Sequence, residues 1–440
     1  MKAFKLLSVT LCLLLAWGFV AAGAQTPAQR TTAFTVSAKE TPEPIAAADT
    51  AAEAKTLAAP HGLRPDAPPY AVRGPYAVGT RDFAIKTPQR TIPITVWYPA
   101  QKPGNKPEKI TYKLDFPTNE FPEFTIAGRA LRDTPPDTSG APYPLVLHTH
   151  AAWSFRQEAA YLVEHLASRG FVVIAPAMED NWGMLLKSIY TSEISRPRDV
   201  SRTLDFGEEL TSMKGALQGL IDMEHVAISG WSWGGQVAME MAGARLNLNE
   251  WLATYCKDFP DDMDCIEYPD HLLDMTKLAG LQTVPEGLWP DWRDPRVDVI
   301  VPLAPGVSMF GGGGLDNVKV PVLLMVGSAD SSVGPGLAYR KAFETLPTAS
   351  KTRVVFDNAE HLLFMNNCTA QPGMAEGGYF WVCSDPVWDM DRAHDLVNHF
   401  ATAFLLAELK GDADAAKALA PENVKFTGIK YETTAYGATP

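Results

Sequence analysis

The chain is poor in basic residues. Its 440 residues include 38 Lys and Arg against 51 Asp and Glu, a formal net charge of −13 at pH 7. Phosphate binding needs clustered Lys and Arg, so this balance argues against a general nucleic-acid or anionic-membrane binder. No internal repeat is found, and with 46% hydrophobic and 20% charged residues the composition is neither collagen-like nor wholly disordered. The length allows one large domain or two or three smaller ones.

One long apolar run stands at the N-terminus. Lys2 and Lys5 precede it, and it ends in Ala-Gly-Ala at residues 22–24, which fits a signal-peptidase site. We predict a signal peptide over residues 1–24 and a periplasmic or secreted mature protein without a stable membrane anchor. A retained anchor is the alternative. Cleavage would remove two lysines and no acid, so the formal charge would change from −13 to −15.

Cysteine is also scarce. Of the five in the chain, one lies in the predicted signal peptide and four form two close pairs, Cys256 with Cys265 and Cys368 with Cys383. In an oxidising compartment an even number in local pairs suggests two short-loop disulfides. The two other pairings and free thiols remain open. The spacing does not match a zinc site, and we expect no metal and no cofactor.

The rest of the chain divides into a leader and one domain. Residues 25–69, rich in Ala, Pro and Thr, are predicted to be a flexible leader, and residues 70–435 the domain. Short apolar runs alternate there with helical periodicity, which predicts an α/β fold with a mostly parallel sheet and helices on both faces. We expect helices at residues 156–169, after Pro197 and at residues 393–410. The apolar runs are RTIPITVWYPA, PLVLHTH, FVVIAPA, HVAISG, VDVIVPLAP, PVLLMVG and TRVVFDN.

Residues 245–295 interrupt this alternation. They contain the first cysteine pair, many acidic residues and several tryptophans. We predict an insertion that caps the edge of the sheet, and a surface loop that serves only packing is the alternative. A calcium site at Asp261, Asp262 and Asp264 is a further alternative, although the spacing does not match a known calcium loop.

A serine stands at one junction between a predicted strand and a predicted helix. In HVAISGWSWGGQVAMEMA, Gly230 and Gly234 flank Ser232 at two residues on either side. A nucleophile elbow requires this placement, because the tight turn leaves no room for a Cβ at the flanking positions. The helix dipole would then face negative charge that forms at the serine. Trp231 is expected to pack in the core.

A nucleophilic serine needs a base and a carboxylate that orients the base. Asp330 follows the run PVLLMVG, and His361 follows TRVVFDN, the order expected in a sheet of this type. Both stand at the carboxyl ends of predicted strands, where an open α/β sheet places its functional residues. We predict a triad of Ser232, Asp330 and His361, with Asp357 or Glu360 as the alternative acid.

The negative charge formed during acyl transfer needs two N–H donors. The backbone N–H of Trp233 is one candidate, and the loop LVLHTHAAW offers the other, most simply Ala152 or its neighbour Ala151. The two histidines of that loop are expected to support it. We expect Trp153 and Trp182 to line the substrate pocket.

Several segments of the chain resemble the α/β-hydrolase superfamily. They are ITVWYPA, PLVLHTHAAW, RGFVVIAPA, RPRDV, ISGWSWGG, VPVLLMVGSAD, NAEHLLF and DPVWDMDRAHDLVNHFATAFLLAELKGD, which together span about residues 75–430. They are most similar to secreted bacterial proteins grouped with platelet-activating-factor acetylhydrolase and predicted dienelactone hydrolases. This chain differs in two ways. His150-Ala151 stands where those proteins usually have His-Gly, and dienelactone hydrolases proper use a cysteine where this chain has Ser232. GWSWGG is also similar to the motif of polyester-degrading cutinase-like enzymes.

The resemblance and the residues together imply a serine esterase with a small-molecule or lipid-like ester as substrate. Acyl transfer to a small acceptor alcohol is an alternative, because a cap that excludes water would favour it. A binding protein on a hydrolase scaffold is the non-enzymatic alternative, and a peptidase would usually have a longer segment before PLVLHTH.

Overall fold

The computed structural model describes residues 62–104, 107–114, 124–179, 189–333 and 336–437. The predicted signal peptide and most of the predicted leader lie outside these residues, as does Trp182. Among the described residues, no helix is long and apolar enough to cross a membrane.

A ten-stranded sheet runs through the domain, in the order β12-β11-β10-β9-β8-β6-β7-β2-β1-β5. From β11 to β7 neighbouring strands are parallel, whereas β2, β1 and β12 pair antiparallel at the two sides. The carboxyl ends of the parallel strands therefore meet at one edge. The strands are β1 Ala77–Lys86, β2 Thr91–Ala100, β5 Leu131–Arg132, β6 Tyr143–Thr149, β7 Val172–Pro176, β8 Ile221–Trp231, β9 Val299–Leu303, β10 Val322–Gly327, β11 Lys351–Phe356 and β12 Ile429–Thr433. A separate hairpin pairs β3 Ile110–Lys113 with β4 Thr125–Gly128.

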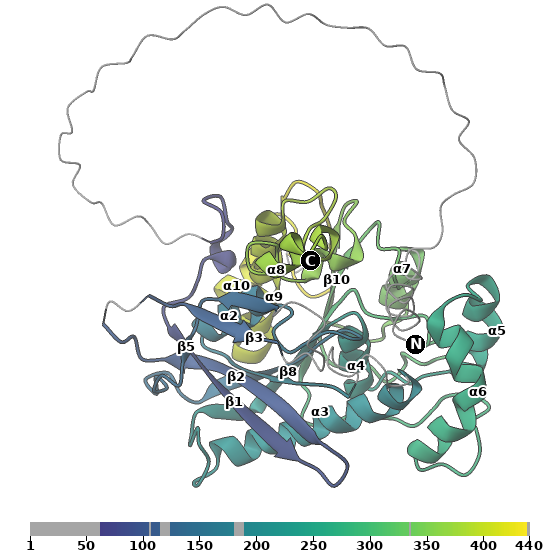
Figure 1. Cartoon of the computed structure of the whole chain (residues 1–440). Coiled ribbons are helices and arrows are strands. Elements are labelled where there is room, and N and C mark those ends of the chain that lie inside the picture. Colours follow the sequence, from purple (N-terminus) through teal and green to yellow (C-terminus); the bar gives the residue numbers. More distant parts are fainter. Residues whose placement is uncertain (1–61, 105–106, 115–123, 180–188, 334–335, 438–440) are drawn as a thin grey trace, which may run out of the picture. The chain divides into compact units, whose positions relative to one another are not determined.

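Helices cover both faces of this sheet, as predicted (Figure 1). Side chains alternate along a strand, so Val146 of β6 packs in one core cluster while Leu145 and Leu147 pack in the other. The first cluster includes side chains of α2 Ala160–Ser168, α9 Met390–Lys410 and α10 Ala413–Ala418; the second includes side chains of α3 Ile189–Thr211, α4 Trp233–Met241 and α7 Gly336–Thr345. Shorter elements are η1 Pro69–Ala71, η3 His361–Phe364, α8 Pro372–Glu376 and η4 Phe380–Cys383.

One of the three expected helices lies within its predicted residues, and the other two begin earlier than predicted. Helix α2 lies within residues 156–169. Helix α9 ends at Gly411 as expected but begins at Met390, because Asp389 caps it by accepting the N–H of Arg392. The helix expected to start at Pro197 is wrong in its start, since α3 begins at Ile189 and contains Pro197 inside. Proline removes one backbone hydrogen bond, and burial of the turns before it outweighs that loss.

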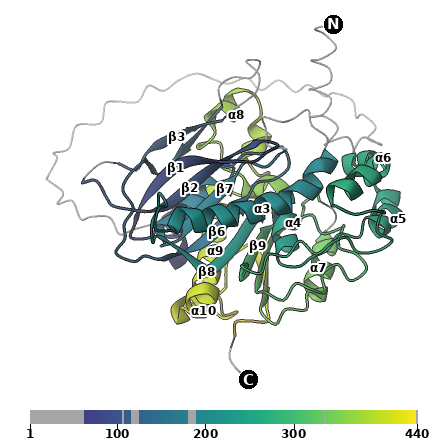
Figure 2. The ribbon, with the colours of Figure 1, turned by 90° about the horizontal axis from the view of Figure 1, so that it is seen from below.

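The segment 245–295 contains a pair of helices, α5 Leu248–Asp258 and α6 Met263–Leu278. The Cys256–Cys265 disulfide joins them, and Cys368–Cys383 joins the loop after η3 to η4, so both expected pairs are bonded. In Figure 2 α5 and α6 lie beyond the end of α3, and α6 packs against α3. Asp262 caps α6 by accepting the N–H of Asp264, and among the described residues no acidic cluster has the geometry of a metal site.

Candidate active site

Ser232 stands at a sharp turn between β8 and α4. Its backbone dihedral angles are φ 56° and ψ −120°, a conformation that L-residues rarely adopt. A Cβ on Gly230 would lie 2.2 Å from Thr149 Oγ1, and one on Gly234 would lie 2.0 Å from the carbonyl oxygen of Thr149. The loop after β6 therefore lies against the turn, and only glycine fits on either side of the serine. The turn leaves Ser232 partly exposed at the carboxyl edge of the sheet.

Asp330 and His361, which follow β10 and β11, contact each other directly. The Nδ1 atom of His361 lies 2.7 Å from Asp330 Oδ2, and both side chains are buried. The alternative acids point elsewhere: Asp357 pairs with Lys430, and Glu360 accepts from the hydroxyl of Ser331. The structure thus places the histidine with Asp330 and with neither alternative.

The surroundings of Asp330 favour its ionised form. Burial alone would raise the pKa of this carboxyl, but the charge and the hydrogen bond of His361 outweigh burial and lower the pKa below its ordinary value. The N–H of Ser332 donates to Oδ1 at 2.9 Å, and the Tyr339 hydroxyl donates to Oδ2 at 3.1 Å. Tyr339 comes from α7 and was not singled out from the sequence, because no motif marks it. The carboxylate is therefore charged and fixed where it can orient His361.

Trp231 links the serine turn to His361. Its indole N–H donates to the backbone carbonyl of His361 at 3.1 Å, and the centroids of the two rings lie 5.1 Å apart. Because Trp231 directly precedes Ser232, this contact brings the histidine next to the serine turn. The side chain is buried, as expected, and its packing partner is the candidate base.

The loop after β6 carries the candidate oxyanion donors. The N–H of Ala151 donates to both carboxylate oxygens of the buried Glu158, at 3.2 and 3.1 Å. Of the two alanines, this engages Ala151 and leaves Ala152 as the candidate donor. Trp233 is the first residue of α4, where a backbone N–H has no partner within the helix. The second candidate donor thus stands directly after the serine.

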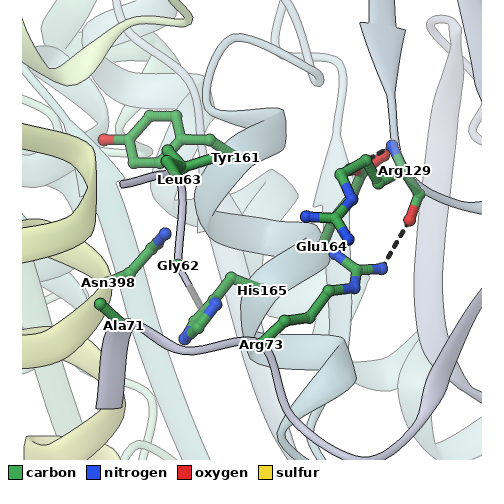
Figure 3. Close-up of a pocket in the computed structure, with 9 residues that line it drawn as sticks. All are labelled: Gly62, Leu63, Ala71, Arg73, Arg129, Tyr161, Glu164, His165 and Asn398. Carbon is green, nitrogen blue, oxygen red and sulfur yellow. Dashed lines mark hydrogen bonds between the residues drawn. The ribbon is translucent and has the colours of Figure 1, made fainter. Parts of the chain in front are cut away.

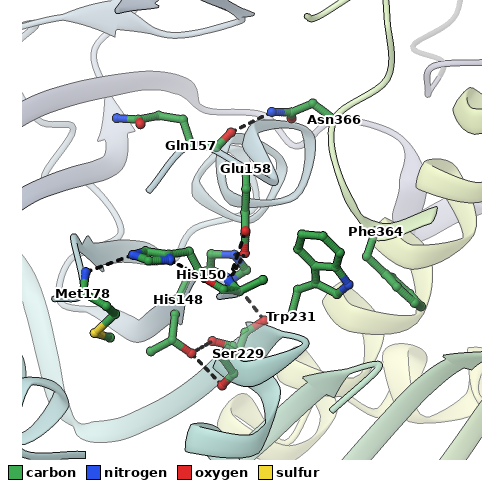
Figure 4. A network of polar contacts seen from close by, with 12 residues as sticks. His148, His150, Gln157, Glu158, Met178, Ser229, Trp231, Phe364 and Asn366 are labelled. Atoms are coloured by element: carbon green, nitrogen blue, oxygen red, sulfur yellow. Dashed lines mark hydrogen bonds and ion pairs between the residues drawn. The ribbon is translucent and has the colours of Figure 1, made fainter. Parts of the chain in front are cut away.

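The two histidines of this loop support it from inside (Figure 4). His150 donates from Nδ1 to the carbonyl of Ala151 at 2.7 Å, and its Nε2 accepts the N–H of Met178 at 2.9 Å. These two partners fix one neutral tautomer of the ring. His148 lies 3.4 Å from the hydroxyl of Ser229 on β8. Both rings are buried; His150 contacts backbone groups, and the other ring nitrogen of His148 lies 3.7 Å from Glu158 Oε1, so both histidines are in supporting positions.

A buried polar cluster beside Trp233 was missed in the sequence. Arg196 and Glu193 of α3 and Gln236 of α4 are all buried, and Gln236 donates to Glu193 at 2.6 Å. Burial raises the pKa of Glu193 to about 7, although Tyr268 of α6 and other donors oppose this shift. The signal in the sequence is helical spacing, because Glu193, Arg196 and Val200 fall on one helix face.

The expected pocket residues are described only in part. Trp153 is half-buried with φ 50°, and Trp182 lies outside the described residues.

A separate pocket lies among η1, α2, α9 and the N-terminal end of the domain (Figure 3), where Arg73 donates to the carbonyl of Arg129. None of the residues that line it is a candidate site residue.

A family model described as Chlorophyllase matches residues 112–254, which include Ser232, Ala152 and Arg196. A ferulic acid esterase from Streptomyces cinnamoneus has a similar structure, with a TM-score of 0.52 and 17% sequence identity, over 85% of this chain and 98% of that chain. No curated protein matches.

The structural likeness and the order of strands establish the α/β-hydrolase fold. The Chlorophyllase match over residues 112–254 and this fold support a carboxylic ester hydrolase, the class that the sequence predicts.

Proposed function

We propose that the protein is an exported serine esterase that cleaves carboxylic esters through an acyl-serine intermediate. The observation that carries the proposal is the 2.7 Å contact between His361 Nδ1 and Asp330 Oδ2 beside the strained turn at Ser232. A serine hydroxyl is a weak nucleophile unless a base takes its proton, and the base must be held in the correct tautomer. Asp330, as an ionised acceptor at Nδ1, leaves Nε2 of His361 as the base.

The proposed reaction has two steps. Ser232 Oγ attacks the ester carbonyl while His361 takes the hydroxyl proton, and the N–H groups of Trp233 and Ala152 stabilise the oxyanion. Collapse of this intermediate releases the alcohol, which receives the proton from His361. Water then attacks the acyl-serine with His361 as base; the bond between Ser232 Oγ and the acyl group breaks, His361 returns the proton to Oγ, and the carboxylic acid leaves. Asp330 stabilises the imidazolium that forms in each step.

Export is proposed on two grounds. The N-terminal segment has the charge, apolar core and small-residue site of a signal peptide. The Cys256–Cys265 and Cys368–Cys383 disulfides suit an oxidising compartment. Amino-terminal sequencing of the mature protein from periplasm and medium tests this: a start at Gln25 supports cleavage, and an uncleaved chain in the membrane fraction contradicts it.

The activity is tested by hydrolysis of p-nitrophenyl esters from acetate to dodecanoate. Methyl ferulate is added because the structural neighbour is a ferulic acid esterase. We expect turnover by the native protein and a fall of about 10⁴-fold or more in kcat for Ser232→Ala, because the remaining groups lack a nucleophile. Ser212→Ala, which removes an exposed hydroxyl at the end of α3, serves as the control and should stay within twofold.

The intermediate is tested by rapid acid quench and intact mass. One acyl group on the native protein, located at Ser232 by peptide mapping and missing in Ser232→Ala, supports the mechanism. A folded native protein that turns over none of these esters, or a Ser232→Ala variant that stays active, contradicts it.

A further inference from the structure

Arg196 of α3 is a buried cation that contacts the loop carrying the candidate oxyanion donors. Its Nη1 donates to the carbonyl of His150 at 2.6 Å, and its Nη2 donates to the carbonyl of Ala151 at 3.0 Å. The side chain is 0% exposed. A planar guanidinium can hold two such carbonyls at fixed angles, which an ammonium cannot do.

One of these two carbonyls belongs to the peptide group that carries a candidate oxyanion donor. The carbonyl of Ala151 and the N–H of Ala152 are part of one planar amide, so a donor that fixes the oxygen also fixes the direction of the N–H. Positive charge at the oxygen polarises the amide and makes its N–H a stronger donor. Arg196 therefore acts on the candidate donor from behind.

The same guanidinium contacts the other candidate donor. Its central carbon lies 4.6 Å from the centroid of the Trp233 ring, a cation–π contact. Trp233 supplies the backbone N–H that directly follows Ser232. The side chain of Arg196 thus contacts both candidate donors, the Ala151–Ala152 peptide after β6 and Trp233 at the start of α4.

Two buried acids lie near this cation. Glu193 lies three residues before Arg196 on α3, and Glu240 lies on α4; the charge of Arg196 acts on both carboxyls. Glu193 is held by Gln236 at 2.6 Å and by the Tyr268 hydroxyl at 3.0 Å. An unpaired buried charge would be costly, and here the two carbonyls and the Trp233 ring are the direct partners of the guanidinium.

We propose that Arg196 is a positioning residue of the oxyanion hole, which orients and polarises the Ala151–Ala152 peptide and fixes Trp233 beside Ser232. The inference rests on the proposed function. Arg196 contacts no substrate, so it acts through the two donors. Because those donors bind the oxyanion more strongly than the neutral ester, its loss should lower kcat much more than it raises KM.

The test compares Arg196→Lys with Arg245→Lys. Arg245 is the matched control, because it also donates to two backbone carbonyls, those of Trp289 and Leu288, outside the candidate site. Each variant is assayed for kcat, KM and the pH profile of kcat/KM. Affinity is measured for a trifluoromethyl ketone, which forms a tetrahedral adduct with the serine, and for the matching methyl ketone. Thermal unfolding reports whether each variant folds.

We expect Arg196→Lys to lower kcat by about 10-fold to 100-fold, below the loss reported for direct removal of one oxyanion donor. KM should stay within threefold, and affinity for the trifluoromethyl ketone should fall by a factor similar to that of kcat. The inflection of the pH profile should not move, because His361 and Asp330 are intact. Arg245→Lys should stay within twofold in all these quantities.

Other results overturn the inference. A folded Arg196→Lys variant whose kcat and trifluoromethyl ketone affinity stay within twofold overturns it, and so does a change confined to KM. If Arg196→Lys does not fold, Trp233→Leu removes the stacking surface and keeps the backbone N–H, and the same criteria apply to it. Activity in Ser232→Ala would instead overturn the proposed function and the inference with it.

Discussion

The two sides of the candidate site are held in different ways. On the acid–base side, His361 and Asp330 contact each other directly, and the carboxylate takes its other donors from Ser332 and Tyr339 close by in the chain. On the oxyanion side, the loop of Ala151 is held by the buried carboxyl of Glu158, seven residues further along the same loop, and by the guanidinium of Arg196 on α3. The acid–base side thus depends mainly on the direct contact between His361 and Asp330. The oxyanion side depends on two buried polar side chains that hold the backbone of the loop.

The buried carboxylates show the same contrast. Next to His361, the pKa of Asp330 is lowered in spite of burial. Beside Arg196, burial dominates and raises the pKa of Glu193 to about 7, while burial and the charge of Glu193 raise that of Glu240. Burial alone therefore does not decide the charge of an acid. At Asp330 the charge and hydrogen bonds of its partners outweigh burial, whereas at Glu193 burial outweighs the charge of Arg196 and the hydrogen bonds of its donors.

The largest effect should come from breaking the pair on the acid–base side. In Asp330→Asn the amide cannot stabilise the imidazolium and can fix the wrong tautomer of His361, so we expect kcat to fall by about 10³-fold to 10⁴-fold. Steady-state kinetics with a p-nitrophenyl ester measure this. Asp357→Asn is the matched control, because this acid precedes His361 by four residues and pairs with Lys430 instead. A larger loss of kcat in Asp357→Asn than in Asp330→Asn would mean that Asp357 orients His361, and would contradict the prediction.

The pH dependence of stability should separate the two sides next. An unfolded glutamate loses its proton near its ordinary pKa of 4.5, whereas burial raises the pKa of folded Glu193 to about 7. Between these values the folded state binds more protons, so this group makes stability fall as pH rises, by up to about 1.4 kcal/mol per pH unit. Asp330 has the opposite sign: it stabilises the fold above its unfolded pKa, and this is lost as pH falls through its lowered folded pKa.

Urea unfolding between pH 4.5 and 7.5 measures this contribution. Glu193→Gln cannot ionise, so its free energy of unfolding should fall less with pH than that of the native protein. Glu209→Gln, at an exposed position of the same helix, should keep the native slope. Equal slopes in Glu193→Gln and the native protein would mean that Glu193 is ionised throughout this range. Glu240, Asp264 and Arg196 face the same cluster and also affect the pH dependence of stability. The contribution of Glu193 is therefore taken from the difference in slope between Glu193→Gln and the native protein.

The contrast also explains what the sequence predicts. The fold follows from apolar runs and turns, and Ser232, Asp330 and His361 stand at strand ends where a local pattern marks them. Arg196 and Glu158 have no such mark. Arg196 is a polar residue on a helical face whose partners lie in another segment, and Glu158 lies in an irregular turn before α2 where no motif predicts its contact with Ala151. The early start of α3 was missed for the same reason: its first turns are stabilised by packing against α6, which no local propensity records.

The smallest predicted change in kcat concerns Glu158, whose carboxyl accepts the N–H of Ala151 in the loop after β6. In Glu158→Gln one of the two oxygens that accept the Ala151 N–H becomes an NH₂ group, and like donors would repel. A small shift of the loop misdirects the Ala152 N–H, so we expect kcat to fall by about 10-fold with KM nearly unchanged. Glu164→Gln is the control, because Glu164 is also buried and accepts a backbone N–H, that of Arg129, at 2.6 Å outside the site. Both variants should lose stability, since each weakens a buried hydrogen bond. If their kcat values fall equally, the effect of Glu158 is general destabilisation; a fall in Glu158→Gln alone shows that the loop must be held in place for the reaction.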